Sequence, residues 1–147
     1  MRIMLLGVGA IGTVVARHLA GHRATTSLTL ADMDTTRAES LARELPGRPR
    51  VDRVDAADET ALVRALRGHD LVVCAILPRF NARVMAAALE ARSHYLDLAA
   101  GEHDQLAHDP EWKRAGLLAV NGMGEDPGIS NVFARHAADR LDTVEAI

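Results

Sequence analysis

The feature that constrains this chain most is a set of three closely spaced glycines near its N-terminus. A short apolar segment, residues 2–6, ends at Gly7, and Gly9 and Gly12 complete a Gly-x-Gly-x-x-Gly pattern. The first glycine permits a tight turn, the second lets a ligand approach the backbone, and the third lets a helix pack closely on the turn. Apolar residues at helical spacing follow, so the pattern predicts a strand, a turn and a helix.

An acidic residue stands where such a unit would recognise the ribose of a dinucleotide. Asp32 follows a second expected strand, residues 27–31, and lies twenty residues after Gly12. Its carboxylate would accept hydrogen bonds from ribose hydroxyls, while the first turn of the expected helix directs free N–H groups at the phosphates. The predicted cofactor-binding residues here are Gly7, Gly9, Ala10, Ile11, Gly12 and Asp32.

The charge of Asp32 also bears on the choice between NAD and NADP. A carboxylate at this position repels the 2′-phosphate that distinguishes NADP, which favours NAD. Arg37 lies about one helical turn further along and is long enough to reach a phosphate, which leaves NADP open. NAD is the predicted cofactor, with NADP as the alternative.

Strand and helix patterns alternate along the rest of the chain. The expected strands cover residues 2–6, 27–31, 50–54, 70–77, 94–98 and 117–121, and a final helix covers residues 130–141. Helix caps are expected at Thr36, Asp58, Asn81 and Asp109, and a C-terminal stop at Gly116. This alternation predicts an α/β fold, a doubly wound, mostly parallel six-stranded Rossmann sheet of order 3-2-1-4-5-6 with helices on both faces, forming one domain over residues 1–147.

Such a topology brings the carboxyl ends of the strands to one edge of the sheet, where ligands bind. Asp55 follows the third expected strand and is predicted beside the adenine, and Leu77 and Pro78 follow the fourth, beside the pyrophosphate and the nicotinamide. Asp97, in the fifth, is the candidate catalytic residue, because a carboxylate there can orient substrate or cofactor. The alternative for Asp97 is a structural carboxylate that caps the following turn.

Composition excludes several other classes of protein. The net charge is −3 with no basic stripe, and only two Phe, one Tyr and one Trp are available to stack on bases, so no nucleic-acid partner is predicted. The apolar runs are too short for a membrane span, and no signal peptide pattern opens the chain. The single cysteine, Cys74, has no partner for a disulfide, which favours the cytoplasm.

No metal site is predicted either. The seven histidines lack the close spacing of metal ligands. Glu102, His103 and Asp104 include the residue types of a charge relay, but adjacent residues rarely face one another and no nucleophile accompanies them. These three residues are interpreted as a solvated loop.

Several motifs together resemble the saccharopine dehydrogenase family, which includes lysine 6-dehydrogenase-like and carboxynorspermidine dehydrogenase-like enzymes. The matching segments are residues 7–12, Ala31-Asp32, Leu77-Pro78, His94-Tyr95-Leu96-Asp97, Ala115-Gly116 and residues 124–128 with Asp126-Pro127-Gly128. The resemblance implies a Rossmann domain that binds NAD or NADP, followed by a second α/β domain that binds an amino-acid or amine substrate. It therefore implies an oxidoreductase that acts on a C–N bond.

Two departures from this family limit the prediction. Many relatives have a sequence that resembles Asp-Arg at the end of the second strand, where this chain has Asp32-Met33. The arginine guanidinium near a possible 2′-phosphate is therefore absent at this position, which again favours NAD. The chain also ends at Ile147, where the family would enter its substrate domain, so we expect an incomplete catalyst that needs this domain for its substrate.

Two further hypotheses concern regulation and assembly. The length and opening motif also fit a nucleotide-sensing regulatory module, like the Rossmann domains of potassium-uptake systems, although Asp126-Pro127-Gly128 is evidence against it. A homo-oligomer is a second expectation, because the final helix would leave Val132 and Phe133 partly uncovered.

Overall fold

Six parallel strands form one sheet in the order β3-β2-β1-β4-β5-β6 in the computed structural model, which describes residues 1–99 and 105–146. The strands are β1 (Arg2–Leu6), β2 (Ser27–Asp32), β3 (Arg50–Arg53), β4 (Leu71–Cys74), β5 (His94–Asp97) and β6 (Ala119–Val120). Every neighbouring pair is parallel, which confirms the predicted Rossmann sheet and its strand order.

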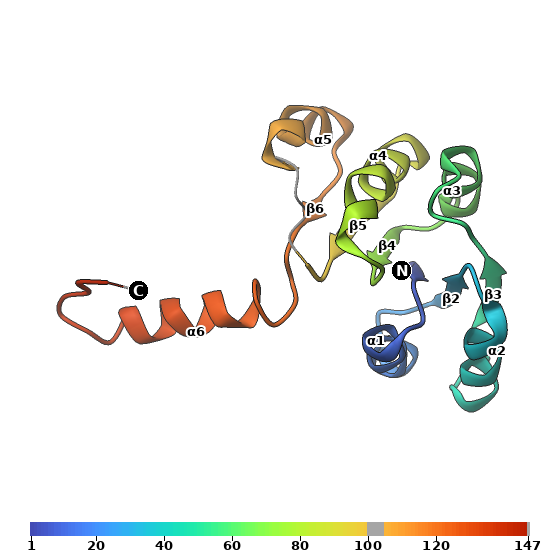
Figure 1. The fold of residues 1–147 in the computed structure, drawn as a ribbon, viewed down its shortest axis with the longest axis horizontal. Coiled ribbons are helices and arrows are strands. Elements are labelled where there is room, and N and C mark those ends of the chain that lie inside the picture. The colour runs from blue at the N-terminus through green and yellow to red at the C-terminus, as the bar shows by residue number, and fades with distance from the viewer. Residues whose placement is uncertain (100–104, 147) are drawn as a thin grey trace.

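Helices pack on both faces of this sheet (Figure 1). The α-helices are α1 (Ala10–Gly21), α2 (Thr35–Glu44), α3 (Glu59–Leu66), α4 (Asn81–Ala91), α5 (Asp109–Ala115) and α6 (Ile129–Ala138), and the short 3-10 helices are η1 (Pro78–Phe80) and η2 (Gln105–His108). Right-handed crossovers explain the arrangement, because they place α1 and α2 on one face and α3, α4 and α5 on the other.

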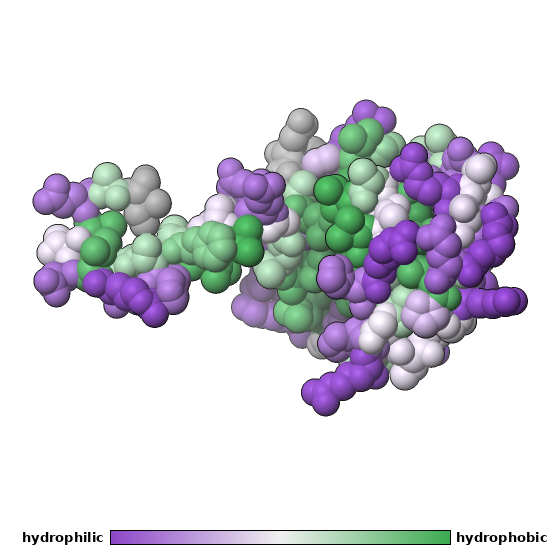
Figure 2. Space-filling model, turned by 90° about the horizontal axis from the view of Figure 1, so that it is seen from below, coloured by the Kyte–Doolittle hydropathy of each residue, from purple (hydrophilic) through white to green (hydrophobic). Residues whose placement is uncertain are grey.

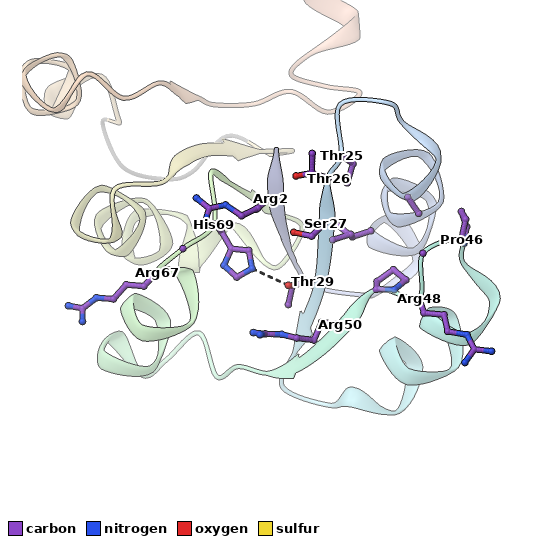
Figure 3. Close-up of a pocket in the computed structure, with 15 residues that line it drawn as sticks. Arg2, Thr25, Thr26, Ser27, Thr29, Pro46, Arg48, Arg50, Arg67 and His69 are labelled. Atoms are coloured by element: carbon purple, nitrogen blue, oxygen red, sulfur yellow. Dashed lines mark hydrogen bonds between the residues drawn. The ribbon is translucent and has the colours of Figure 1, made fainter.

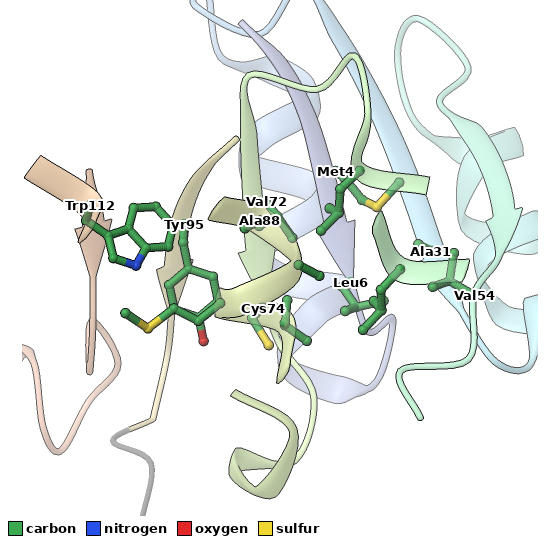
Figure 4. Close-up of a cluster of buried hydrophobic side chains, with 14 residues drawn as sticks. Met4, Leu6, Ala31, Val54, Val72, Cys74, Ala88, Tyr95 and Trp112 are labelled. Carbon is green, nitrogen blue, oxygen red and sulfur yellow. The ribbon is translucent and has the colours of Figure 1, made fainter. Parts of the chain in front are cut away.

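The alternation of side chains along β1 divides the core into two layers. Ile3 and Leu5 pack with residues of α1 and α2, whereas Met4 and Leu6 pack with residues of α3, α4 and α5. The second layer is shown in Figure 4, where the rings of Tyr95 and Trp112 have centroids 6.4 Å apart. Both faces of β1 are therefore covered, as its continuous apolar sequence requires.

Local signals explain most helix ends, with three differences from the predictions. One is at α5, where Asp109 is the first residue of the helix and His108 is the N-cap, without a side-chain hydrogen bond. Asp58 caps α3 as predicted, with its side chain accepting from the N–H of Ala61 at 2.9 Å. Helix α2 is capped by Asp34 rather than Thr36, because the Asp34 carboxylate accepts from both the N–H and the hydroxyl of Thr36. Asn81 does not cap α4, since its amide reaches Ala99 instead.

The fourth strand is shorter than predicted and ends at Cys74. Cys74 pairs with Leu6, the last residue of β1, so residues 75–77 have no strand beside them on that side. The backbone there leaves the sheet, and η1 begins at Pro78. This departure positions the residues that line the candidate site described below.

Helix α6 stands apart from the rest of the chain (Figure 1). It has no buried residue, and the side chains of Val132 and Phe133 are 60% and 62% exposed. Figure 2 shows apolar side chains along this projecting part of the chain and on the neighbouring surface of the rest of the protein. Among the described residues no helix is both long and apolar enough to cross a membrane.

An exposed ion pair at the start of the sheet predicts a defined response to acid. Arg2 donates to the Asp70 carboxylate at 2.7 Å and holds the pKa of that carboxyl at about 2. A depressed pKa stabilises the folded state above the unfolded pKa of about 4, and that stability disappears as the pH falls towards 2. The melting temperatures of the native chain and Asp70→Asn should differ at pH 5 and converge at pH 2. A difference that is independent of pH would contradict this role.

Candidate functional site

A cavity of about 500 Å³ lies at the carboxyl edge of the sheet, where β1, β2, β3 and β4 end. Six of the predicted cofactor-binding residues line this carboxyl-edge cavity: Gly7, Gly9, Asp32, Asp55, Leu77 and Pro78. The three others, Ala10, Ile11 and Gly12, form the first turn of α1 directly behind Gly9. The parallel sheet thus brings together residues that lie far apart in the sequence.

The three glycines have three different surroundings. Gly7 has a φ of +98°, and a Cβ there would lie 2.6 Å from the carbonyl oxygen of Ala75. A Cβ on Gly12 would overlap the carbonyl oxygen of Gly7, so α1 can approach the loop only because residue 12 has no side chain. A Cβ on Gly9 would meet no atom within 4 Å beyond its chain neighbours, which leaves open space in front of the backbone.

This open space lies at the N-terminus of α1, where no side chain caps the helix. The first N–H groups of a helix lack intrahelical acceptors and carry partial positive charge, so they bind anionic groups well. The backbone of residues 7–12, which we call the glycine loop, therefore fits a dinucleotide diphosphate in space and in charge.

Asp32 faces the glycine loop from the end of β2. Its Oδ2 accepts from the N–H of Val8 at 2.7 Å, and its Oδ1 accepts from the N–H of Asp34 at 3.2 Å. Both bonds hold the carboxylate at the cavity wall. Each carboxylate oxygen has a further lone pair, so Asp32 retains the capacity to accept from a ribose hydroxyl.

The other predicted residues form the remaining walls. Asp55 is exposed in the turn after β3, where its carboxylate accepts from the N–H of Ala57 at 2.8 Å. Leu77 is 55% exposed and leads into η1 with Pro78. The residues that the sequence analysis did not identify are Leu6, Met33, Val54, Ala56, Ala75, Ile76, Arg79 and Phe80. All of them are at or within a few residues of a predicted strand end, which is the signal that would have found them.

Asp97 has a different position from the other predicted site residues. It is 0% exposed and does not line the carboxyl-edge cavity. Its Oδ2 accepts from the Tyr95 hydroxyl at 3.0 Å and its Oδ1 from the N–H of Gly122 at 2.6 Å, so it connects β5 to the segment after β6. This geometry favours the structural alternative. The catalytic role of Asp97 remains a prediction and would require the carboxylate to be uncovered.

Tyr95 and Cys74, the buried polar residues near Asp97, stay uncharged. Burial raises the pKa of the Tyr95 hydroxyl and raises that of the Cys74 thiol to about 11, so both stay protonated at neutral pH. Tyr95 is 1% exposed and belongs to the core. These residues are suited to holding strand ends together rather than to exchanging protons with a ligand.

Replacement of Tyr95 by phenylalanine tests this structural role. Tyr95→Phe removes the hydroxyl that donates to Asp97 and leaves a buried carboxylate oxygen with one donor fewer. We expect the free energy of unfolding to fall by about 1 to 2 kcal/mol in urea denaturation. An unchanged free energy of unfolding would show that the hydrogen bond contributes nothing.

A second cavity, of about 510 Å³, lies at the opposite, amino edge of the sheet (Figure 3). Thr29 and His69 point toward each other there, with Oγ1 and Nε2 3.0 Å apart, and burial lowers the pKa of His69. Arg2 and Arg50 are paired with Asp70 and Asp52, and Arg67 follows the last residue of α3. A cation at a helix C-terminus is stabilising, which explains Arg67, and the ion pairs explain Arg2 and Arg50.

Among the described residues no group of three or more histidine, cysteine, aspartate or glutamate side chains is arranged to hold a metal ion. Glu102, His103 and Asp104, interpreted above as a solvated loop, lie outside the described residues. The segment Asp126-Pro127-Gly128 forms a turn, with Gly128 at a φ of +137° and the N–H of Gly124 donating to the carbonyl of Pro127 at 3.0 Å.

Comparisons with known proteins agree with this geometry. The chain is 33% identical to the carboxyaminopropylagmatine dehydrogenase of Synechocystis sp. over 92% of its own length and 37% of that enzyme. It is 29% identical to the saccharopine dehydrogenase (NADP(+), L-glutamate-forming) of Schizosaccharomyces pombe over 90% of its length and 29% of that enzyme. The chain therefore spans about a third of the length of these relatives.

A solved structure and a family model extend the comparison. Apo saccharopine dehydrogenase (L-Glu forming) from Saccharomyces cerevisiae superposes with a TM-score of 0.84 at 26% identity, over 95% of this chain and 31% of that one. The model of the saccharopine dehydrogenase NADP binding domain matches residues 3–120, which include all of the sheet except Arg2 and all the residues that line the carboxyl-edge cavity. The resemblance noted in the sequence is confirmed, and this chain belongs to the saccharopine dehydrogenase NADP-binding domain family.

Proposed function

We propose that this chain supplies the dinucleotide-binding part of an oxidoreductase that acts on a C–N bond of an amino acid or a polyamine-type substrate. The observation that carries this proposal is the open space at Gly9, which lies before the uncapped N-terminus of α1 and opens into a cavity of about 500 Å³. The names of the relatives, a carboxyaminopropylagmatine dehydrogenase and a saccharopine dehydrogenase, support the substrate class.

In this proposal the bound nicotinamide cofactor supplies hydride transfer, and the chain supplies binding and orientation. The N–H groups of Ala10 and Ile11 would face the diphosphate, and Asp32 would accept from the ribose hydroxyls. Leu77 and Pro78 would cover the side of the cofactor towards the nicotinamide and exclude water from it. The substrate pocket would come from polypeptide that the relatives have in addition.

We propose that this chain prefers NAD to NADP, although the family description and one relative's name specify NADP. The Asp32 carboxylate is held by two backbone N–H groups, so it cannot turn away from a 2′-phosphate without losing both bonds. Arg37 is exposed and donates to the carbonyl of Val8 at 3.5 Å, a weak contact that it could exchange for a phosphate. The fixed negative charge of Asp32 therefore outweighs the mobile positive charge of Arg37, and the balance favours NAD.

The dissociation constants of NADH and NADPH test this preference. The native chain should bind NADH about tenfold more tightly than NADPH, and Asp32→Asn should reduce this ratio by improving the binding of NADPH. Arg37→Gln serves as the matched control and should leave NADH binding unchanged. Equal or tighter binding of NADPH by the native chain would contradict the proposal and agree with the NADP in the family description.

The substrate class is tested by joining this chain to the region that its relatives have in addition. Fusion of this chain to the additional region of the Synechocystis relative should give NAD-dependent oxidation of a secondary amine, followed by absorbance at 340 nm, whereas the chain alone should not. A sensory function, the alternative from the sequence, would instead give dinucleotide binding with no activity in the fusion. The family assignment favours the oxidoreductase.

Assembly and location complete the proposal. We propose a homo-oligomer, because α6 has no buried residue and exposes Val132 and Phe133. Light scattering on the purified chain tests this proposal, and a monomer at all concentrations would contradict it. The cytoplasm remains the proposed compartment, since the buried Cys74 has no other cysteine in the sequence to pair with.

A further inference from the structure

With a dinucleotide bound, the carboxyl-edge cavity would hold more negative charge than the glycine loop alone can neutralise. A dinucleotide brings two negative charges on its diphosphate, and the cavity already contains the carboxylates of Asp32 and Asp55. Backbone N–H groups at a helix N-terminus supply only about half a positive charge. A cation close to the diphosphate would therefore contribute strongly to binding.

Arg79 is the one cationic side chain that lines this cavity among the described residues. It is exposed, and its guanidinium lies 5.0 Å from the ring centroid of Phe80, which also lines the cavity. Within the described part of the chain Arg79 has no hydrogen bond or ion pair to a carboxylate. Its five N–H donors are thus available to a ligand, and the ring limits the directions in which they can point.

The position of Arg79 in the fold places it across the carboxyl-edge cavity from the glycine loop. It lies in η1, directly after β4 leaves the sheet, and β4 neighbours β1, which ends before Gly7. The two loops touch, since a Cβ on Gly7 would lie 2.6 Å from a side-chain carbon of Ile76, three residues before Arg79. Arg79 and the glycine loop therefore line the same cavity from neighbouring segments of the chain.

We propose that Arg79 donates hydrogen bonds to the diphosphate of the bound dinucleotide, opposite the N-terminus of α1. This inference rests on the proposed dinucleotide binding at the carboxyl edge and adds a residue to it. The guanidinium forms two parallel bonds to phosphate oxygens and neutralises part of their charge. Because the diphosphate is common to NAD and NADP, Arg79 stabilises both cofactors equally and does not select between them.

Calorimetric titration of NADH, NADPH and ADP-ribose into the native chain and into Arg79→Gln tests this proposal. The dissociation constants of all three ligands should rise about tenfold in Arg79→Gln, and Arg79→Lys should recover part of the loss. The dependence of binding on salt should also weaken, because one ionic contact is lost. The thermal melting curve should not move, since Arg79 makes no contact that the fold needs.

Arg83→Gln is the matched control. Arg83 lies in the next turn, pairs with Glu59 at 3.2 Å and does not line the cavity, so its replacement should change the dissociation constants less than twofold. Unchanged binding in Arg79→Gln would overturn this inference but not the proposed function. A loss confined to NADPH would also overturn it, by assigning Arg79 to the 2′-phosphate. Absence of binding by the native chain would instead refute the proposed function.

Discussion

Replacing Gly9 by aspartate is expected to abolish dinucleotide binding and leave the fold as stable as before. A Cβ at this position would meet no atom within 4 Å beyond its chain neighbours, and the φ of −71° and ψ of −164° suit any residue. Aspartate is a good N-cap, so the free energy of unfolding should change by only a few tenths of a kcal/mol. The new carboxylate occupies the space of the diphosphate and repels it, so the NADH dissociation constant should rise at least about a hundredfold.

Gly9→Asn separates charge from volume, because asparagine has nearly the same shape without the charge. It should weaken binding less than Gly9→Asp at the same stability. Urea denaturation and NADH fluorescence measure the two quantities on the same samples. Unimpaired NADH binding by Gly9→Asp would show that the phosphates do not lie at the N-terminus of α1.

The opposite result is expected at Gly12, three residues away. A Cβ there would overlap the carbonyl oxygen of Gly7, which is backbone and cannot move without displacing the loop from Ala31, whose carbonyl accepts from the N–H of Gly7 at 2.8 Å. Gly12→Ala should therefore lower the free energy of unfolding by about 3 kcal/mol or more, measured by urea denaturation.

Gly21→Ala is the control for this substitution. Gly21 is the last residue of α1, has open space around its Cβ position and does not require a positive φ. Alanine is a better helix former than glycine, so Gly21→Ala should leave stability unchanged or raise it by up to about 1 kcal/mol. Equal stabilities of Gly12→Ala and Gly21→Ala would contradict the close packing of α1 on the glycine loop.

The elements of the fold were predictable because each depends on a local signal. The alternation of Ile3 and Leu5 with Met4 and Leu6 marks a strand covered on both faces, and the parallel order follows from the βα alternation. The ends of elements were less predictable, because they depend on neighbours. The length of β4, for example, is limited by the point where β1 ends, at Leu6.

The site was predictable only in part, for a related reason. Gly7, Gly9 and Asp32 were identified because a dinucleotide imposes their spacing, and the structure brings all three to one cavity. Arg79 has no such spacing signal, and only the course of the chain after Cys74 shows that it lines the same cavity. For Asp97, position at a strand end suggested function, whereas its burial depends on β6, which pairs with β5.

Isothermal titration of NADH into the purified 147-residue chain tests the central claim most directly. The open glycine loop, the uncapped helix and Asp32 predict a single site with a dissociation constant between micromolar and millimolar, abolished by Gly9→Asp. Absence of detectable binding of NADH and NADPH, by a chain whose melting curve shows that it is folded, would contradict the claim that this cavity holds a dinucleotide.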